Sequence, residues 1–163
     1  MTNSAMPFFK LSTTPSKLLV VVVLILSFIG FLDASYLTFK HYSGTPINCA
    51  IFNGCEEVTN SKYATIGPVP VALLGAIYYA LIFLLVIAYL DSKNPKFFNL
   101  AALMTPLGLI ASLGLVYLQL FIIKAICLYC MVSAADSTLL FVAGALYFYK
   151  SIPNKTFTAP PTK

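Results

Sequence analysis

Residues 18–39 read LLVVVVLILSFIGFLDASYLTF, an apolar run that is interrupted by a single charged residue, Asp33. A helix needs about 20 apolar residues to cross the hydrocarbon core of a bilayer. Three further runs meet this requirement, at about 69–90, 98–123 and 126–149. The sequence therefore predicts an all-α membrane protein whose fold is a four-transmembrane-helix bundle.

The composition excludes an ordinary soluble protein. Hydrophobic residues make up 60% of the chain and charged residues only 9%, whereas about a quarter of the residues in a soluble domain are charged. We therefore expect one integral membrane domain over residues 1–163. The formal net charge of +5 comes from lysines alone, and because they gather at the ends of the apolar runs, they predict membrane topology and no nucleic-acid surface. The first run is too long for a cleaved signal peptide.

The lysines also predict which way the helices point. Four spans place both termini on one side of the membrane, and most of the lysines fall on that side, whereas Lys40, Lys62 and Lys124 fall on the other. The positive-inside rule then predicts cytoplasmic termini and a long extracytoplasmic loop at 40–68. Because no endoplasmic reticulum retention signal stands at Lys163, a prokaryotic plasma membrane is favoured over the endoplasmic reticulum.

This topology brings the four cysteines to one membrane surface. Cys49 and Cys55 lie in the long loop, and Cys127 and Cys130 open the fourth span as a C-x-x-C motif. Residues three apart share one face of a helix, and a helix N-terminus stabilises a thiolate, the form that attacks disulfides. The C-x-x-C pair is therefore expected to be a redox pair that faces an oxidising compartment.

The loop pair leaves alternatives open. Asn53-Gly54 is a turn dipeptide, and residues 56–61 are compatible with a short helix that would place Cys55 at its start. Taken alone, Cys49 and Cys55 fit a static loop disulfide as well as a redox pair. A zinc site is disfavoured because the cysteine spacing is not that of a zinc knuckle, so no metal is expected.

The same segments carry a resemblance. The loop has Cys49, then Gly54-Cys55-Glu56-Glu57-Val58, then Ser61, the second span opens with Pro70-Val71-Ala72-Leu73-Leu74-Gly75, and the last span carries Cys127-Leu128-Tyr129-Cys130. Over roughly residues 16–149, this combination resembles the vitamin K epoxide reductase family. No single element of the combination would be specific enough.

The resemblance implies a membrane thiol–quinone oxidoreductase that supports disulfide bond formation. A thioredoxin-like protein would pass electrons to Cys49 and Cys55, and Cys55 would attack the Cys127–Cys130 disulfide. Cys127 would be the exchange partner of Cys130, which would be the thiol nearest the quinone. Ser61 matches a position that steadies the site by hydrogen bonding. Because this chain ends without the thioredoxin domain that many family members carry, the thioredoxin-like partner is expected to be a separate protein.

The resemblance also implies a quinone site beside Cys130. Family members that reduce vitamin K carry an Asn and a Tyr that hydrogen-bond the quinone oxygens, and the corresponding positions here are Val71 and Ala134. Both are apolar, so the acceptor is left open among ubiquinone, menaquinone and a vitamin K type quinone, and epoxide reduction is in doubt. Further residues expected near the quinone are Gly75, Tyr79 and Phe141.

Two carboxyl groups inside the spans are candidates for function. Asp136 follows Cys127 by nine residues, a net half turn of helix, so it is expected to point away from the cysteines and to form an interhelical hydrogen bond. Asp33 is expected to point away as well, with proton supply as the alternative role.

Two other functions compete with the enzyme. A structural or scaffold protein with two static disulfides would lose only its folding when the cysteines are removed. A small transporter would use the carboxyl groups in the spans, but the second and third spans carry no charge and no internal repeat is evident.

Overall fold

The computed structural model describes residues 14–47 and 54–151. Within these ranges the elements are α1 Lys17–Ser43, α2 Cys55–Thr59, β1 Thr65–Ile66, β2 Val69–Pro70, α3 Val71–Ser92, α4 Pro95–Tyr117, the π-helix η2 Leu118–Ile123, and α5 Leu128–Ser151. Four helical segments are long and apolar enough to span a membrane, with η2 continuing α4 as one segment. The four-helix membrane fold expected from the sequence is therefore confirmed.

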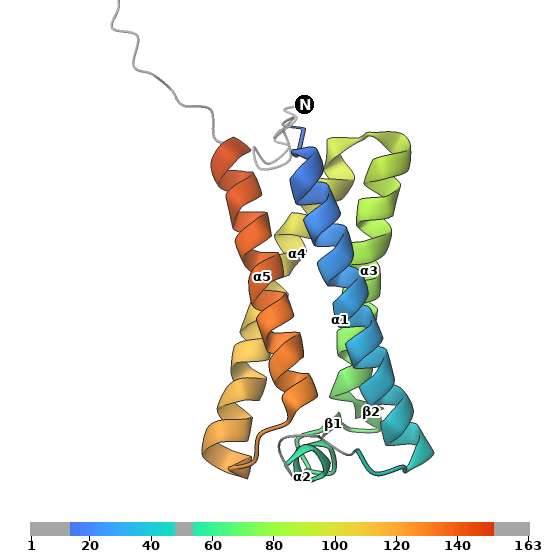
Figure 1. Cartoon of the computed structure of the whole chain (residues 1–163), viewed down its shortest axis with the longest axis vertical. Coiled ribbons are helices and arrows are strands. Elements are labelled where there is room, and N and C mark those ends of the chain that lie inside the picture. Colours follow the sequence, from blue (N-terminus) through green and yellow to red (C-terminus); the bar gives the residue numbers. More distant parts are fainter. Residues whose placement is uncertain (1–13, 48–53, 152–163) are drawn as a thin grey trace, which may run out of the picture.

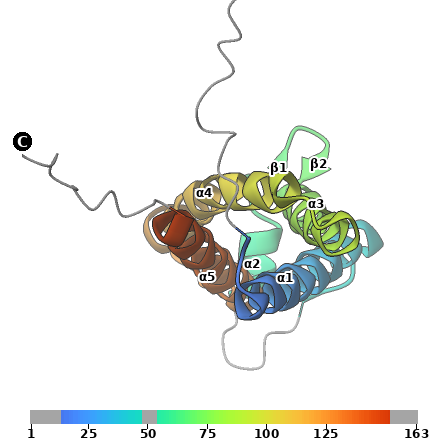
Figure 2. The same ribbon diagram turned by 90° about the horizontal axis from the view of Figure 1, so that it is seen from above.

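The long helices form a closed ring. Helix α1 packs against α3 and α5, and α4 packs against the same two helices from the other side (Figure 2). Many leucine, isoleucine and phenylalanine side chains on the outside of the ring are exposed. In a spanning helix such side chains face lipid, so the fold is that of a multi-pass membrane protein.

The ends of the helices follow from local sequence. Ser16 caps α1 by accepting a hydrogen bond from the Leu19 N–H, and Asn94 caps α4 by accepting from the Lys96 N–H. Pro95 then opens α4 at a position where its missing N–H costs nothing. Gly44 ends α1 in the left-handed conformation, with φ of 61°.

Hydrophobic and aromatic packing fills the half of the bundle away from α2. Phe98 lies between Tyr89 and Tyr147, with ring centroids 5.5 and 4.9 Å away, and Ile82 and Leu140 of the same core cluster are fully buried. The Tyr147 hydroxyl donates a hydrogen bond to the side-chain oxygen of Asn99. This half of the molecule therefore forms a rigid base for the other half.

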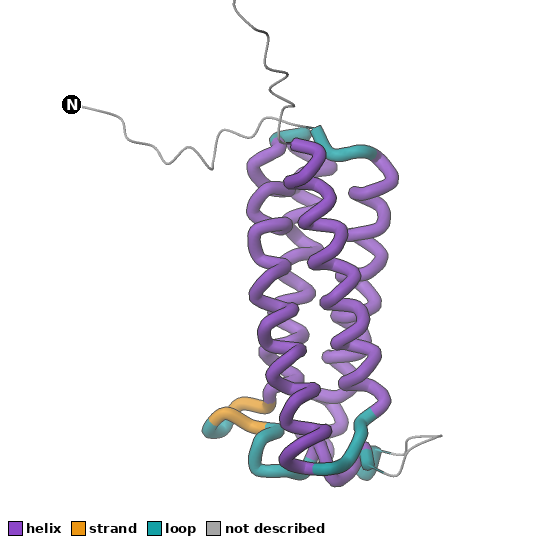
Figure 3. The backbone as a smooth tube through the Cα atoms, turned by 90° about the vertical axis from the view of Figure 1, so that its left-hand side faces the viewer, coloured by secondary structure: helices purple, strands orange, loops and turns teal. Residues whose placement is uncertain are grey.

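The connection between α1 and α3 closes one end of the bundle. Figure 1 shows α2 lying across this end, opposite the start of α1 and the end of α5. The β1–β2 hairpin, which pairs Thr65 with Pro70, stands to the side of α2 and leads into α3 (Figure 3). The Val71 N–H donates to the Ala64 carbonyl oxygen and ties this connection to the first turn of α3.

Candidate functional site

Cys127 and Cys130 occupy the start of α5 at the end that α2 covers. Helix α5 begins at Leu128, so Cys127 immediately precedes it and Cys130 lies in its first turn. Both are free thiols, and Cys127 is completely buried while Cys130 is partly exposed. The Met131 N–H donates to the Cys127 carbonyl oxygen at 3.1 Å, which closes the first helical turn around the pair.

The two thiols differ in their proton affinity. A hydrogen bond from the Cys130 side chain lowers the pKa of Cys127 to about 7, with further help from the backbone N–H groups of Cys130 and Tyr129. The backbone contributions are the effect of a helix N-terminus on a thiol, whereas burial of Cys127 opposes the shift. Cys127 is therefore the group of the pair that is ready to carry a negative charge near neutral pH.

The Cys127 thiolate should titrate with a midpoint near pH 7. Below that pH the thiol dominates, and above it the thiolate, whose ultraviolet absorbance can be followed in the reduced protein. In Cys130→Ala the main stabilising hydrogen bond is lost, so the midpoint should move upward, toward the ordinary thiol value of about 8.5. Cys127→Ala is the matched control, and an unchanged midpoint in Cys130→Ala would contradict the assignment.

Cys55 lies next to this pair although it comes from a distant part of the sequence. It is the first residue of α2, is 1% exposed, and takes part in a disulfide. Cys55 and Cys127 belong to one buried cluster, to which Leu37, Val58 and Ala125 also contribute. The short helix that the sequence indicated is present, and Cys55 starts it as expected. Cys49 lies outside the described residues.

Gly54 makes this close approach possible. A Cβ atom added at Gly54 would lie 2.8 Å from the Ile126 nitrogen, 2.9 Å from the Ile126 oxygen and 3.1 Å from the Ala125 Cβ. Real Cβ atoms do not approach backbone this closely, so only glycine allows the start of α2 to rest on the turn that precedes Cys127. This backbone contact therefore holds Cys55, which follows Gly54, close to Cys127.

A second support for Cys127 comes from Gln119, which sequence reasoning missed. Its side-chain Oε1 accepts a hydrogen bond from the Cys127 N–H at 2.9 Å, and its carbonyl oxygen accepts from the Ala125 N–H at 3.2 Å. Gln119 is 2% exposed and lies in the π-helix η2. The available signal was a polar amide inside an apolar run, close to the C-x-x-C.

A cavity opens beside Cys130 within the ring of helices. Four residues that the sequence placed near a quinone line it, namely Val71, Gly75, Cys130 and Ala134. Most of the other walls are apolar, and the polar lining side chains include Asp33, His41, Ser61, Tyr63, Ser112, Gln119 and Ser133. An apolar cavity with a few polar groups is typical of a site for a lipid-soluble small molecule.

Ser61 lies at the outer wall of this cavity. Its hydroxyl donates to the Val58 carbonyl oxygen at 2.7 Å and so closes the C-terminal end of α2. The Ala64 N–H in turn donates to the Ser61 carbonyl oxygen at 2.9 Å. These bonds fix the segment between α2 and β1 above the cavity.

Of the two aromatic residues expected near the quinone, Tyr79 and Phe141, only the first lines one of the two cavities. Tyr79 lines a second cavity, between α3, α4 and α5, which shares Gly75 and Ser133 with the first. Its hydroxyl donates to the Ser133 carbonyl oxygen at 2.9 Å. Phe141 lines neither of these two cavities.

The carboxyl groups within the spans depart from expectation. Asp33 lines the cavity together with Cys130, so the expectation that it points away from the cysteines was wrong. Asp136 does face another helix, because a Cβ at Gly30 of α1 would lie 2.6 Å from its Oδ2. That oxygen has no hydrogen-bond partner among the described residues, so it does not form the interhelical bond that we expected.

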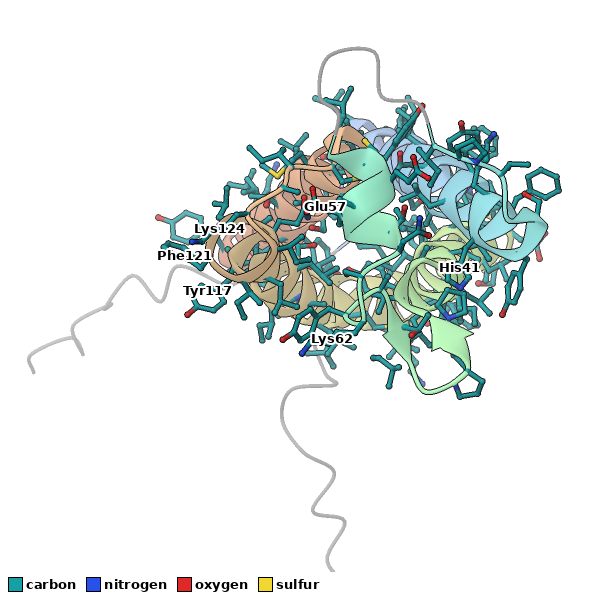
Figure 4. The ribbon with its side chains drawn as sticks, turned by 90° about the horizontal axis from the view of Figure 1, so that it is seen from below. His41, Glu57, Lys62, Tyr117, Phe121 and Lys124 are labelled. Atoms are coloured by element: carbon teal, nitrogen blue, oxygen red, sulfur yellow. The ribbon has the colours of Figure 1, made fainter. Side chains whose placement is uncertain are left out.

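At the end of the bundle that α2 covers, the residues over the middle differ from those at the edge. Seen from this end, Glu57 lies on α2 over the middle of the bundle, while Lys62, Lys124, Tyr117 and Phe121 lie toward its edge (Figure 4). The Tyr117 and Phe121 rings stack with centroids 4.9 Å apart, and both are more than half exposed. Exposed aromatic rings beside a lysine are typical of a membrane–water boundary.

Comparisons with known proteins agree with this geometry. Residues 21–145, a region that includes all four cysteines, match the model of the vitamin K epoxide reductase family. The chain is also 32% identical over 118 residues to the thiol-disulfide oxidoreductase LTO1 of Arabidopsis thaliana. That alignment covers 68% of this chain and 31% of the relative, so this chain spans about a third of the relative's length.

Proposed function

The chain belongs to the vitamin K epoxide reductase family, and from this premise we propose that it is a membrane thiol–quinone oxidoreductase that supports disulfide bond formation. The observation that carries the proposal is the shared buried cluster of Cys55 and Cys127, with Cys130 on the wall of the neighbouring cavity. Thiol–disulfide exchange needs each thiolate to reach the next disulfide. A relay in the order Cys55, Cys127, Cys130, cavity is supported by the shared cluster of Cys55 and Cys127 and by the place of Cys130 on the cavity wall.

Electrons enter through the loop. A thioredoxin-like protein with a reduced dithiol exchanges with the Cys49–Cys55 disulfide and leaves oxidised. The Cys55 thiolate then attacks the Cys127 sulfur of the Cys127–Cys130 disulfide, which forms a Cys55–Cys127 bond and releases Cys130. Attack by Cys49 on Cys55 restores the loop disulfide and releases Cys127. Each exchange breaks one S–S bond and forms one, so two electrons move inward.

Electrons leave through the cavity. The reduced Cys127–Cys130 pair becomes a disulfide again as it passes two electrons to a quinone, which takes up two protons. The redox state of the described cysteines corresponds to the stage before this transfer, because Cys55 is in a disulfide while Cys127 and Cys130 are thiols. A low pKa of Cys127 suits this sequence, because Cys127 is the leaving thiolate when Cys49 attacks the Cys55–Cys127 bond.

The mostly apolar residues around the cavity fit a lipid-soluble quinone. The apolar side chains of Val71 and Ala134 offer no hydrogen bond to its oxygens, so other lining groups must bind them. Ubiquinone and menaquinone are both lipid-soluble and both suit an apolar site that lies among membrane helices. We propose such a respiratory-type quinone as the acceptor and a separate thioredoxin-like protein as the donor.

Trapping of the internal mixed disulfide tests the proposal against a scaffold with static disulfides. In Cys130→Ala, the remaining Cys127 thiolate should attack the loop disulfide and accumulate as a Cys55–Cys127 link, detectable by mass spectrometry after cleavage at Lys62 and Lys124. In the control variant Cys127→Ala, a Cys55–Cys130 link should be absent or much weaker, because Cys55 and Cys127 are both buried members of the cluster whereas Cys130 only packs against it. A Cys130→Ala protein that folds without any Cys55–Cys127 link would rule out the relay.

A further inference from the structure

Asp33 is a partly buried acid that the electron relay leaves without a role. It lies inside the α1 span, and its Oδ2 is buried without a hydrogen-bond partner among the described residues. An unpaired carboxylate is costly at such a position, so the surroundings favour the neutral, proton-carrying form. Carboxyl groups in a membrane interior are functional candidates for this reason.

The position of Asp33 connects it to the proposed quinone site. Asp33, Leu37 and His41 are spaced by four residues on α1, and all three line the cavity that Cys130 also lines. Eight residues of helix span about 12 Å. One face of α1 therefore forms a wall that runs from His41, near the end covered by α2, inward to Asp33.

Two other titratable groups lie near Asp33, on two neighbouring helices. Asp136 of α5 and Tyr79 of α3 meet at Gly30, where an added Cβ would lie 2.6 Å from the Asp136 Oδ2 and 2.5 Å from the Tyr79 Cε1. Tyr79 is already bonded to the Ser133 carbonyl oxygen, and Asp136 lines neither cavity. Asp33 is thus the carboxyl group of the described spans that reaches the cavity.

The chemistry needs a proton that the cysteines do not carry. Reduction of a quinone consumes two electrons and two protons. A neutral dithiol would supply both protons, but the pKa of about 7 leaves about half of Cys127 as a thiolate at pH 7 and most of it above that pH. In the thiolate form, one of these protons is missing. The pair then brings two electrons and one proton, on Cys130. The second proton must come from another group at the cavity.

We propose that Asp33 is this proton donor and that its proton is replaced from water at the His41 end of the cavity. The proposal rests on the thiol–quinone function proposed above. In each turnover one proton moves from the Asp33 carboxyl group to a quinone oxygen, and the Cys130 thiol proton accounts for the other. The electrons come only from the two sulfur atoms, so Asp33 is neither oxidised nor reduced.

The test measures quinone reduction in a single turnover by protein whose Cys127–Cys130 pair has been reduced beforehand. Loss of a general acid typically costs a factor of 10² to 10⁴, so Asp33→Asn should slow hydroquinone formation by about 100-fold. Asp33→Glu should recover part of the rate. Asp136→Asn makes the same change at a buried acid that does not line the cavity, and it should stay within about threefold of wild type, well short of the loss expected for a general acid.

A spectroscopic measurement separates proton donation from a packing role. Infrared difference spectra of wild type during quinone reduction should show a perturbed carboxylic acid band that shifts in heavy water, and this band should vanish in Asp33→Asn. A wild-type rate in Asp33→Asn, or equal losses in both Asn variants with no such band, would overturn the proposal. Failure of wild type itself to reduce any quinone would instead remove the proposed function, and this inference with it.

Discussion

Gly54→Val is expected to reduce electron transfer from the thioredoxin-like partner to the quinone by about 100-fold, the loss that a misplacement of about 1 Å can cause. Even a single Cβ at residue 54 would lie 2.8 Å from the Ile126 nitrogen, and valine adds two more methyl groups. The start of α2 must then move away from the turn before Cys127. Since Cys55 follows directly, its sulfur moves away from Cys127 as well.

Two measurements identify the cause of this loss. The yield of the Cys55–Cys127 link in a Cys130→Ala background should fall together with the rate. The control is Gly114→Val in α4, where an added Cβ meets nothing within 4 Å, and it should retain near wild-type activity. A Gly54→Val protein with normal link formation would show that the contact between α2 and the 125–127 turn does not position the two cysteines.

Gln119→Leu is expected to lower the same activity by about tenfold. Leucine fills a similar space but leaves the buried Cys127 N–H without its acceptor, and an unsatisfied buried donor costs about 1–3 kcal/mol. About 1.4 kcal/mol corresponds to a factor of ten. The Ala125 N–H bonds to the backbone carbonyl oxygen of residue 119, which leucine keeps, so the variant removes only the side-chain bond that holds the Cys127 N–H.

Gln119→Glu serves as the matched variant because it keeps an oxygen at the accepting position. It should recover much of the activity lost in Gln119→Leu when both are assayed with the same partner and quinone. Unfolding temperatures of the two variants show whether the loss lies in the site or in the whole bundle. Full activity in Gln119→Leu would mean that the hydrogen bond to Cys127 has no part in the exchange.

The sequence predicted the four helices well because the membrane imposes a simple rule. A span of about 20 apolar residues has few alternatives in lipid, so long apolar runs predict helices reliably. The short helix at Cys55 was also predictable, from the Asn53-Gly54 turn and the acidic residues that follow. The change from α4 to the π-helix η2 has no comparable signal, and the third run was accordingly expected as one helix.

Which face of each helix points inward was harder to predict. A helix that is apolar on all sides gives no periodic signal, so the sequence does not tell which way Asp33 points. Its direction is decided by how the helices pack. The expectation for Asp136 held in part, since its distance from the cysteines in the sequence fixes its angle on a single helix. Asp33 lies on another helix, and its position relative to the cysteines depends on how α1 packs against α3 and α5.

Contacts between distant segments were the hardest features to predict from the sequence. The turn at Gly54 was expected, but its close approach to Ile126 depends on how the loop folds back over the bundle. In the same way, Gln119 was visible as a polar residue in an apolar run, but its bond to the Cys127 N–H follows from the turn at 124–127. Both residues act through tertiary contacts that no local pattern encodes.

Quinone reduction by the purified protein is the most direct test of the central claim. The protein, supplied with a reduced thioredoxin-like protein and either ubiquinone or menaquinone, would be followed through the ultraviolet absorbance of the quinone, with Cys130→Ala measured in parallel. We predict quinone reduction that depends on the dithiol and is lost in Cys130→Ala. No reduction of either quinone by wild-type protein, with its four cysteines stably paired, would contradict the account and leave a scaffold with static disulfides.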